Sequence, residues 1–169
     1  MTGSTTVITD TDSTAPASPY NGQTWTTTVA NTITPNTANW CLNLPTQTTV
    51  TKSSTTASAI TRTIGFTPDY INCRMTQQVM EPGSATYKVS EDLQYDLFGN
   101  VNSDKITGVN MTARTTLTDW GTTGQFPKTI TNPLSQPTQY GYNFDLGFRT
   151  SITDPIASKL PGYPITSPA

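Results

Sequence analysis

The sequence predicts an all-β protein whose strands form an antiparallel meander with essentially no helix. Two observations support this prediction. Short threonine-rich segments alternate apolar and polar residues, and threonine is β-branched and suits the pleated surface of a strand. The 13 prolines are spread along the 169 residues and would interrupt long helices, because each proline removes a backbone donor. Successive short strands joined by turns pair with their neighbours in sequence, which gives a meander.

The first half of the chain is expected to contain four strands after a disordered arm. Residues 1–20 are rich in Thr, Ser, Asp and Pro without regular alternation, which is typical of such an arm. Alternation then predicts strands, with polar loops at 34–39 and 52–58, over residues 24–29, 46–51, 60–66 and 73–79. The turn Glu81-Pro82-Gly83-Ser84 carries Pro second and Gly third, the signature of a type II β-turn.

The second half continues the meander. Strands are expected over residues 87–95, 101–106, 111–118, 128–131, 139–142 and 149–153. Gly99-Asn100 is expected to reverse the chain between the first two of these strands. Residues 156–169 are Pro-rich and lack alternation, which predicts an irregular tail. The β-sheet region is therefore assigned to residues 21–155.

An aromatic residue followed by a proline turn recurs in the second half. Trp120 precedes Pro133 by 13 positions, and Tyr142 precedes Pro155 by 13. Tyr95, Trp120 and Tyr142 stand 25 and 22 positions apart. A period of roughly this length, built from strands and turns, predicts a repeat protein rather than one compact enzyme core.

Residues that suit a hairpin turn accompany each aromatic. Gly99, Gly124 and Gly147 follow their aromatic by four or five positions, where glycine permits positive φ at a reversal. Asp96 and Asn143 follow their aromatic directly, and a short carboxylate or amide there can accept a backbone N–H, as in an Asx-turn. We expect the aromatics to be buried and to stack on their equivalents in adjoining repeats. All these residues are therefore assigned structural roles.

The segment Tyr95-Asp96-Leu97-Phe98-Gly99-Asn100-Val101 resembles the YD-x-x-G core of the RHS/YD-repeat family. Asn132-Pro133 and Asp154-Pro155 resemble the turn that follows it, which in the family usually reads DP-x-G. The resemblance implies an open, curved sheet of β-hairpins that is part of a hollow shell, like those of bacterial RHS proteins and teneurins. It further implies a fragment of a larger bacterial secreted or cell-surface protein. Its function would be a non-catalytic scaffold that encloses or presents a toxin or effector domain, with neighbouring repeats and that domain as partners.

The chain departs from the family pattern in two places. Asp119 precedes Trp120 instead of following it, so the role of the family aspartate is not carried over to this repeat. The family's self-cleaving region, with paired acidic residues, has no counterpart in the C-terminal segment. Asp154-Pro155 is therefore expected to be an ordinary turn.

Composition argues against several other functions. The sequence has no histidine, which removes Ser-His-Asp and Cys-His triads and the commonest zinc ligand. We predict no enzyme activity, no cofactor and no metal site, and a carboxylate pair is the enzymatic alternative left open. The 9 Lys and Arg residues are scattered, which argues against nucleic-acid binding. No apolar stretch is long enough to insert into a membrane, and the first residues lack the pattern of a signal peptide.

The cysteines and the tryptophans leave alternatives open. Cys41 and Cys73 are a candidate disulfide, but two small buried hydrophobic side chains are the preferred interpretation. Trp25, Trp40 and Trp120, with seven tyrosines, could line a carbohydrate-binding platform. The alternative function is a stand-alone, adhesin-like β-sandwich that binds carbohydrate or a host protein. Open edge strands also favour self-association.

Overall fold

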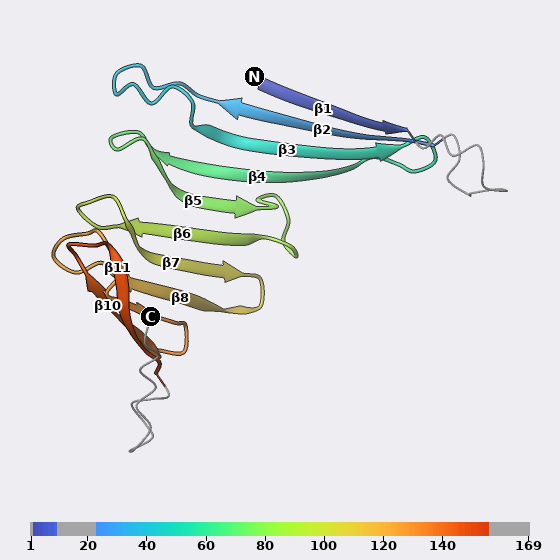
Figure 1. Ribbon diagram of the computed structural model, residues 1–169. Helices are drawn as coiled ribbons and strands as arrows, with labels where there is room; N and C mark the ends of the chain where they lie inside the picture. Colours follow the sequence, from blue (N-terminus) through green and yellow to red (C-terminus); the bar gives the residue numbers. More distant parts are fainter. Residues whose placement is uncertain (1, 10–22, 156–169) are drawn as a thin grey trace. The chain divides into compact units, whose positions relative to one another are not determined.

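The computed structural model describes residues 2–9 and 23–155, and these residues form an all-β fold. Eleven strands are hydrogen-bonded in sequence order from β1 to β11 (Figure 1). The sheet does not close, because β1 and β11 stand at opposite ends of that order. No helix occurs within the described ranges. The prediction of an antiparallel meander without helix is confirmed.

The chain divides into two compact units between Ser90 and Glu91. The first unit contains β1 (Thr2–Thr9), β2 (Thr24–Ile33), β3 (Pro45–Ser54), β4 (Ile60–Asp69) and β5 (Arg74–Met80). Next comes β6 (Val89–Tyr95), which begins at the division. The second unit continues with β7 (Val101–Gly108), β8 (Met111–Asp119), β9 (Thr129–Thr131), β10 (Pro137–Asn143) and β11 (Phe148–Thr153).

The first strand lies in the segment that the sequence predicts to be a disordered arm. Thr2–Thr9 pairs with β2 along its whole length, with Thr2 opposite Asn31 and Thr9 opposite Thr24. Residues 5–9 are all β-branched, and such residues favour a strand once a neighbouring strand is available to pair with. Thr2–Thr9 is therefore a strand rather than part of an arm. The rest of the predicted arm from residue 10 onward and the predicted tail at 156–169 lie outside the described residues.

One predicted loop is shorter in the structure than the sequence indicates, and one predicted turn forms where it is expected. β3 runs to Ser54, inside the predicted loop at 52–58, because Lys52 pairs on both sides, with Thr27 and with Ile60. After β5, the Ser84 N–H donates to Glu81 O at 2.9 Å, so a β-turn does form at the predicted residues.

The type II assignment of that turn is wrong. A type II turn requires positive φ at its third residue, and Gly83 is not among the glycines that have positive φ. The left-handed residue is instead Glu81, with φ 49°. From this position the Glu81 N–H donates to Thr63 O at 2.8 Å, and its carboxylate lies 3.6 Å from the Arg62 guanidinium. These longer-range contacts with β4 set the backbone of the turn.

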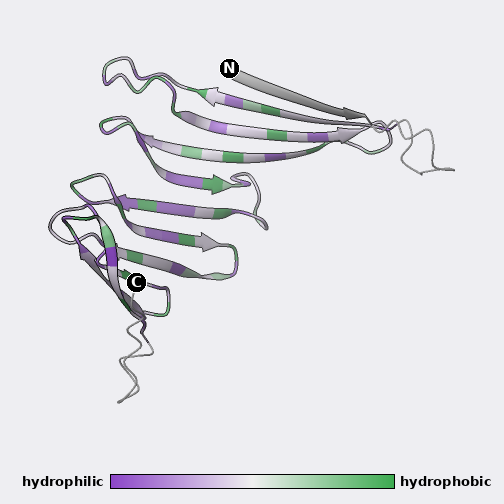
Figure 2. Ribbon diagram, in the orientation of Figure 1, coloured by the Kyte–Doolittle hydropathy of each residue, from purple (hydrophilic) through white to green (hydrophobic). Residues whose placement is uncertain are grey.

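The register of unit 1 sorts its side chains onto two different faces, because successive residues of a strand point to opposite sides. Val29 lies opposite Val50, and Val50 lies opposite Arg62. We call this side the apolar face. The same register places six further residues on it: Trp25, Lys52, Ile60, Ile64, Phe66 and Met80. The other side, the threonine face, carries Thr26, Thr28, Thr49, Thr51, Thr61 and Thr63. Figure 2 shows this alternation as short blocks of different hydropathy along the strands.

The sheet encloses almost no core. Among the described residues, Cys41 is the one buried hydrophobic side chain, with 2% of its surface exposed. Large apolar side chains are exposed instead, including Trp40, Ile60, Ile71, Leu97, Leu134 and Leu146. One face of a sheet is usually covered by a second layer, and the described part of the chain supplies none. The strand ladders and the loops must therefore hold each unit together.

Two glycine substitutions test the corrected turn. We expect Gly83→Ala to change the free energy of unfolding by less than about 0.5 kcal/mol, since Gly83 has ordinary φ and open space around a Cβ. Gly99→Ala should cost about 1 kcal/mol or more, because Gly99 has φ 90° although it too has open space. Urea unfolding of the two variants measures the difference. Equal losses of unfolding free energy in the two variants would indicate that Gly83 also has positive φ, as a type II turn requires.

Candidate functional site

One hairpin loop of unit 2 is capped by its own first residue. In the loop Asp96–Asn100, the Asp96 carboxylate accepts the backbone N–H groups of Phe98 and Asn100, both at 2.9 Å. The Asp96 N–H in turn donates to Asn100 O at 2.9 Å, which closes the loop. Gly99 takes the left-handed conformation, with φ 90°. The predicted Asx-turn at Asp96 and the predicted positive φ at Gly99 are both confirmed.

The proline turn that follows β9 has the same structure. Asn132 Oδ1 accepts the N–H groups of Leu134 at 2.9 Å and of Gln136 at 3.1 Å. The Asn132 N–H donates to Gln136 O at 3.1 Å, and Ser135 takes the left-handed position with φ 60°. Pro133 occupies the exposed second position, where a fixed φ suits the turn. The YD turn and the proline turn, which look different in sequence, are thus one type of loop.

A second type of loop is one residue longer and occurs in both units. It starts with an Asx residue, carries a left-handed residue four positions later, and closes on the residue after that. The starting residues are Asn36, Asp69 and Asn143, and the left-handed residues are Trp40, Cys73 and Gly147, with φ 57°, 51° and 71°. Asn143 Oδ1 accepts the Leu146 N–H at 3.0 Å, as the sequence predicts for this position.

The loop between β8 and β9 corrects the interpretation of Asp119. The sequence gives no turn role to this aspartate because it precedes Trp120. In the structure its carboxylate accepts the Gly121 N–H at 2.8 Å, so Asp119 does cap its loop. The cap needs the Asx residue at the end of the incoming strand, and the place of the aromatic beside it does not matter.

Successive loops of unit 2 are also fastened to one another. The Asn100 side chain donates from its Nδ2 to Gly124 O at 2.7 Å. Gly124 has the predicted positive φ, 67°, and a Cβ at this position would collide with the Phe98 ring. Trp120 donates from its indole Nε1 to Val101 O at 2.8 Å, which ties the end of β8 to the start of β7.

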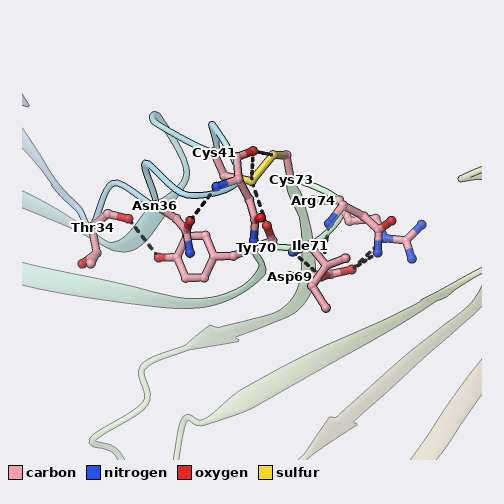
Figure 3. The surroundings of a disulfide bond; sticks show 10 residues. Thr34, Asn36, Cys41, Asp69, Tyr70, Ile71, Cys73 and Arg74 are labelled. Carbon is pink, nitrogen blue, oxygen red and sulfur yellow. Dashed lines mark hydrogen bonds and ion pairs between the residues drawn. A yellow bond between two sulfur atoms is a disulfide. The ribbon is translucent and has the colours of Figure 1, made fainter.

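In unit 1 a disulfide joins the corresponding loops. Cys41 and Cys73 are bonded, with their Cα atoms 5.1 Å apart, and they link the loop after β2 to the loop after β4 (Figure 3). The Tyr70 hydroxyl adds a second link between these loops, donating to Thr34 O at 3.0 Å. The preferred interpretation of two free buried cysteines is therefore wrong, and the disulfide alternative holds. Sequence could not decide between them, because the meander register that brings the loops together is a tertiary property.

The aromatic residues of the repeats lie differently from the prediction. Tyr95, Trp120 and Tyr142 are half-buried rather than buried. Tyr142 stacks on Phe126, a residue of the loop between β8 and β9, with ring centroids 4.7 Å apart and planes 13° apart. Phe144 packs against the same ring at 5.7 Å. The stacking partner thus comes from a loop rather than from an equivalent aromatic.

These rings line the cavity that is the candidate functional site of unit 2. Its volume is about 390 Å³, and the lining residues include Trp120, Phe126, Lys128, Tyr140, Tyr142 and Phe144. Thr122 and Thr123 add hydroxyl groups at its rim. Four of the six aromatic and basic positions were not singled out in the sequence: Phe126, Lys128, Tyr140 and Phe144. Phe126 directly precedes a proline in an irregular segment, so no periodic signal marks it.

One side-chain oxygen in each of two β7 residues lacks a hydrogen-bond partner. Asn102 Oδ1 and Asp104 Oδ1 are shielded from solvent and accept no hydrogen bond within the described part of the chain. Such an acceptor costs free energy until a donor reaches it. Asn102 and Asp104 alternate with Ser103, so they lie on one side of the strand.

Two loop aspartates have altered acidity. For Asp96, partial desolvation raises the pKa, but the hydrogen bonds from Asn100, Phe98 and Gly99 together outweigh it, so the pKa falls below its usual range. For Asp69, the side-chain bond from Asn72 is the main reason that the pKa is lowered, with the Ile71 N–H second.

The remaining predicted site residues and possible sites need only brief mention. Asp154 and Pro155 are the last described residues, so the turn that the sequence predicts at Asp154-Pro155 lies mostly outside the described part. No cluster of three or more His, Cys, Asp or Glu side chains suited to a metal is found among the described residues. Within the same residues, no helix has the length and apolar character needed to cross a membrane.

The fold defines an all-β protein with one open antiparallel meander sheet, whose loops carry Asx caps. Comparison with known proteins adds no closer assignment: no family model, no curated protein and no solved structure matches the chain. The resemblance to RHS/YD repeats therefore depends on the sequence motifs and stays a prediction.

Removal of the disulfide should destabilise unit 1. The bond closes a loop with a sequence separation of 32, and we expect the double variant Cys41→Ser with Cys73→Ser to lose about 3–4 kcal/mol of unfolding free energy. Urea unfolding followed by circular dichroism measures the loss. Wild-type protein reduced with dithiothreitol is the matched control and should be destabilised similarly. A loss below about 0.5 kcal/mol would show that the bond does not stabilise the folded state relative to the unfolded chain.

The loop caps should make stability depend on pH at the acid end. A lowered folded pKa means that the caps at Asp69 and Asp96 stabilise the protein above the unfolded pKa, about 3.9, and that this stabilisation is lost as pH falls through the lower folded values. We expect the melting temperature of the wild type to fall more steeply below about pH 4 than that of Asp69→Asn with Asp96→Asn. The control is Asp145→Asn, which removes a charge from an exposed loop position. Parallel curves of melting temperature against pH for the wild type and the double variant would contradict the stabilising role of the two caps.

Proposed function

We propose that this chain is a non-catalytic structural segment of a longer β-repeat wall, of the kind that RHS-type shells form around a toxin or effector domain. The observation that carries the proposal is the absence of an enclosed core. A sheet with one buried hydrophobic residue in its described part buries too little apolar surface to be stable as an independent domain. In a wall, further repeats and the enclosed domain would cover what is exposed here.

The outer strands support this proposal. Within the described residues, β1 and β11 each pair with one neighbour, β2 and β10. The far edge of each strand therefore keeps backbone groups that a further hairpin could pair with. Repeat proteins gain stability by adding such neighbours, since a single repeat cannot bury its own faces.

The loops support it in another way. In each Asx-capped loop the side chain of the first residue accepts backbone N–H groups of the same loop. The turn therefore needs no hydrogen-bond partner for these groups from elsewhere in the chain, and such a hairpin can be repeated. Three carboxylates, those of Asp69, Asp96 and Asp119, are engaged as caps of their loops. These engagements favour a structural role over catalysis.

The disulfide supports an exported location. Disulfides persist in oxidising compartments and are rare in the reducing cytosol. The bond between Cys41 and Cys73 therefore favours a secreted or cell-surface parent protein. This agrees with the location that the family resemblance implies.

The alternative of a stand-alone β-sandwich is not supported. A sandwich requires two sheets packed face to face, and the described strands form one sheet in simple sequence order. The fold half of that alternative is wrong. Ligand binding as such is a separate question, which the aromatic cavity of unit 2 raises by itself.

The wall function predicts association of the isolated chain. We expect light scattering to show growth of the average mass with concentration in the micromolar range, because the free edges and the apolar face find partners in other copies. Thr150→Lys places a charge on the exposed edge strand β11 and should reduce this association. Thr122→Lys, the same change in an exposed loop, should not. A monodisperse monomer with a sharp, reversible thermal transition would show an autonomous domain and overturn the proposal.

A further inference from the structure

We infer that the aromatic cavity of unit 2 binds the ring of a neutral sugar. This inference does not depend on the wall function. It rests on the residues that line the cavity and on the contacts that fix its aromatic rings.

The cavity has the size and the rigidity of a ligand site. Its volume of about 390 Å³ lies within the usual range for small-molecule pockets, about 300–1,000 Å³. Phe126 and Tyr142 hold one another in a stack, and the Trp120 indole is fixed by its bond to Val101 O. The rings are therefore positioned before any ligand arrives, which lowers the entropic cost of binding.

The lining combines ring faces with polar groups. Trp120, Tyr140 and Tyr142 supply aromatic surface, while Lys128, Thr122 and Thr123 supply donors and hydroxyl groups. A purely apolar ligand would bury those polar groups without partners, at a cost of about 1–3 kcal/mol for each. A sugar ring presents C–H groups on its faces and hydroxyls around its edge. It can thus satisfy both kinds of lining at once.

The polar part of the lining indicates how the sugar would be held. Among the described residues, Lys128 is the one Lys, Arg, Asp or Glu side chain that lines the cavity, and its ammonium group can donate to a ring hydroxyl. The hydroxyls of Thr122 and Thr123 can donate to or accept from further hydroxyls of the sugar. All these contacts can be made to a sugar that carries no charge.

The test is titration of the purified chain with neutral hexasaccharides, observed by NMR and calorimetry. The probes are β-1,4-linked glucose, β-1,4-linked N-acetylglucosamine and α-1,4-linked glucose. At least one of them is expected to bind with Kd below about 1 mM. Tyr140→Ala should weaken that binding about tenfold, because it removes a ring of the cavity. The matched control is Trp40→Ala, which removes an aromatic that is 80% exposed in unit 1 and should leave binding unchanged.

Circular dichroism of each variant confirms that it is folded. The inference is overturned if none of the neutral probes binds at millimolar concentration. It is equally overturned if Trp40→Ala weakens binding as much as Tyr140→Ala, or if only an anionic polymer such as heparin binds.

Discussion

The hydrogen bond from a loop N–H to the oxygen of an Asn or Asp at the end of the incoming strand is the interaction on which this structure depends. Such a bond caps loops in both units, at Asn36, Asp69, Asp96, Asp119 and Asn143, and again at Asn132. In most proteins a packed interior fixes the register of a sheet. Here, with Cys41 as the one buried hydrophobic residue in the described part, the loops must do so.

Links between neighbouring loops add the long-range order that a core would otherwise give. Unit 1 uses a covalent link, the disulfide between Cys41 and Cys73. Unit 2 uses packing and hydrogen bonding, with Gly124 beneath the Phe98 ring and held by the Asn100 side chain. In both units the linked loops belong to successive hairpins, so within each unit one hairpin holds the next in place. Further hairpins can be added to a sheet built this way by the same contacts, as a wall of repeats requires.

The two proposals concern different parts of the chain and are compatible. A wall needs edges and an apolar surface for its neighbours, and unit 1 supplies an apolar face, with the threonine face on the opposite side of the sheet. Ligand binding needs a rigid, chemically mixed cavity, and unit 2 supplies one where the loop after β8 folds back on β10. A scaffold that also binds sugar would be able to attach its cargo to a surface.

Local sequence determined the strands, most turns and the glycines at left-handed positions. Alternation of residue type locates a strand because side chains point to opposite faces with a period of two, and glycine marks positive φ because other residues resist it. For the same reason the Asx caps at Asp96 and Asn143 were predictable: cap and loop lie within a few residues of each other. Only the tertiary structure decided the disulfide, the pairing of β1, the turn at Glu81 and the stacking of Phe126 on Tyr142. Each of these joins residues that are distant in sequence, and their approach depends on strand register, which no local pattern in the chain encodes.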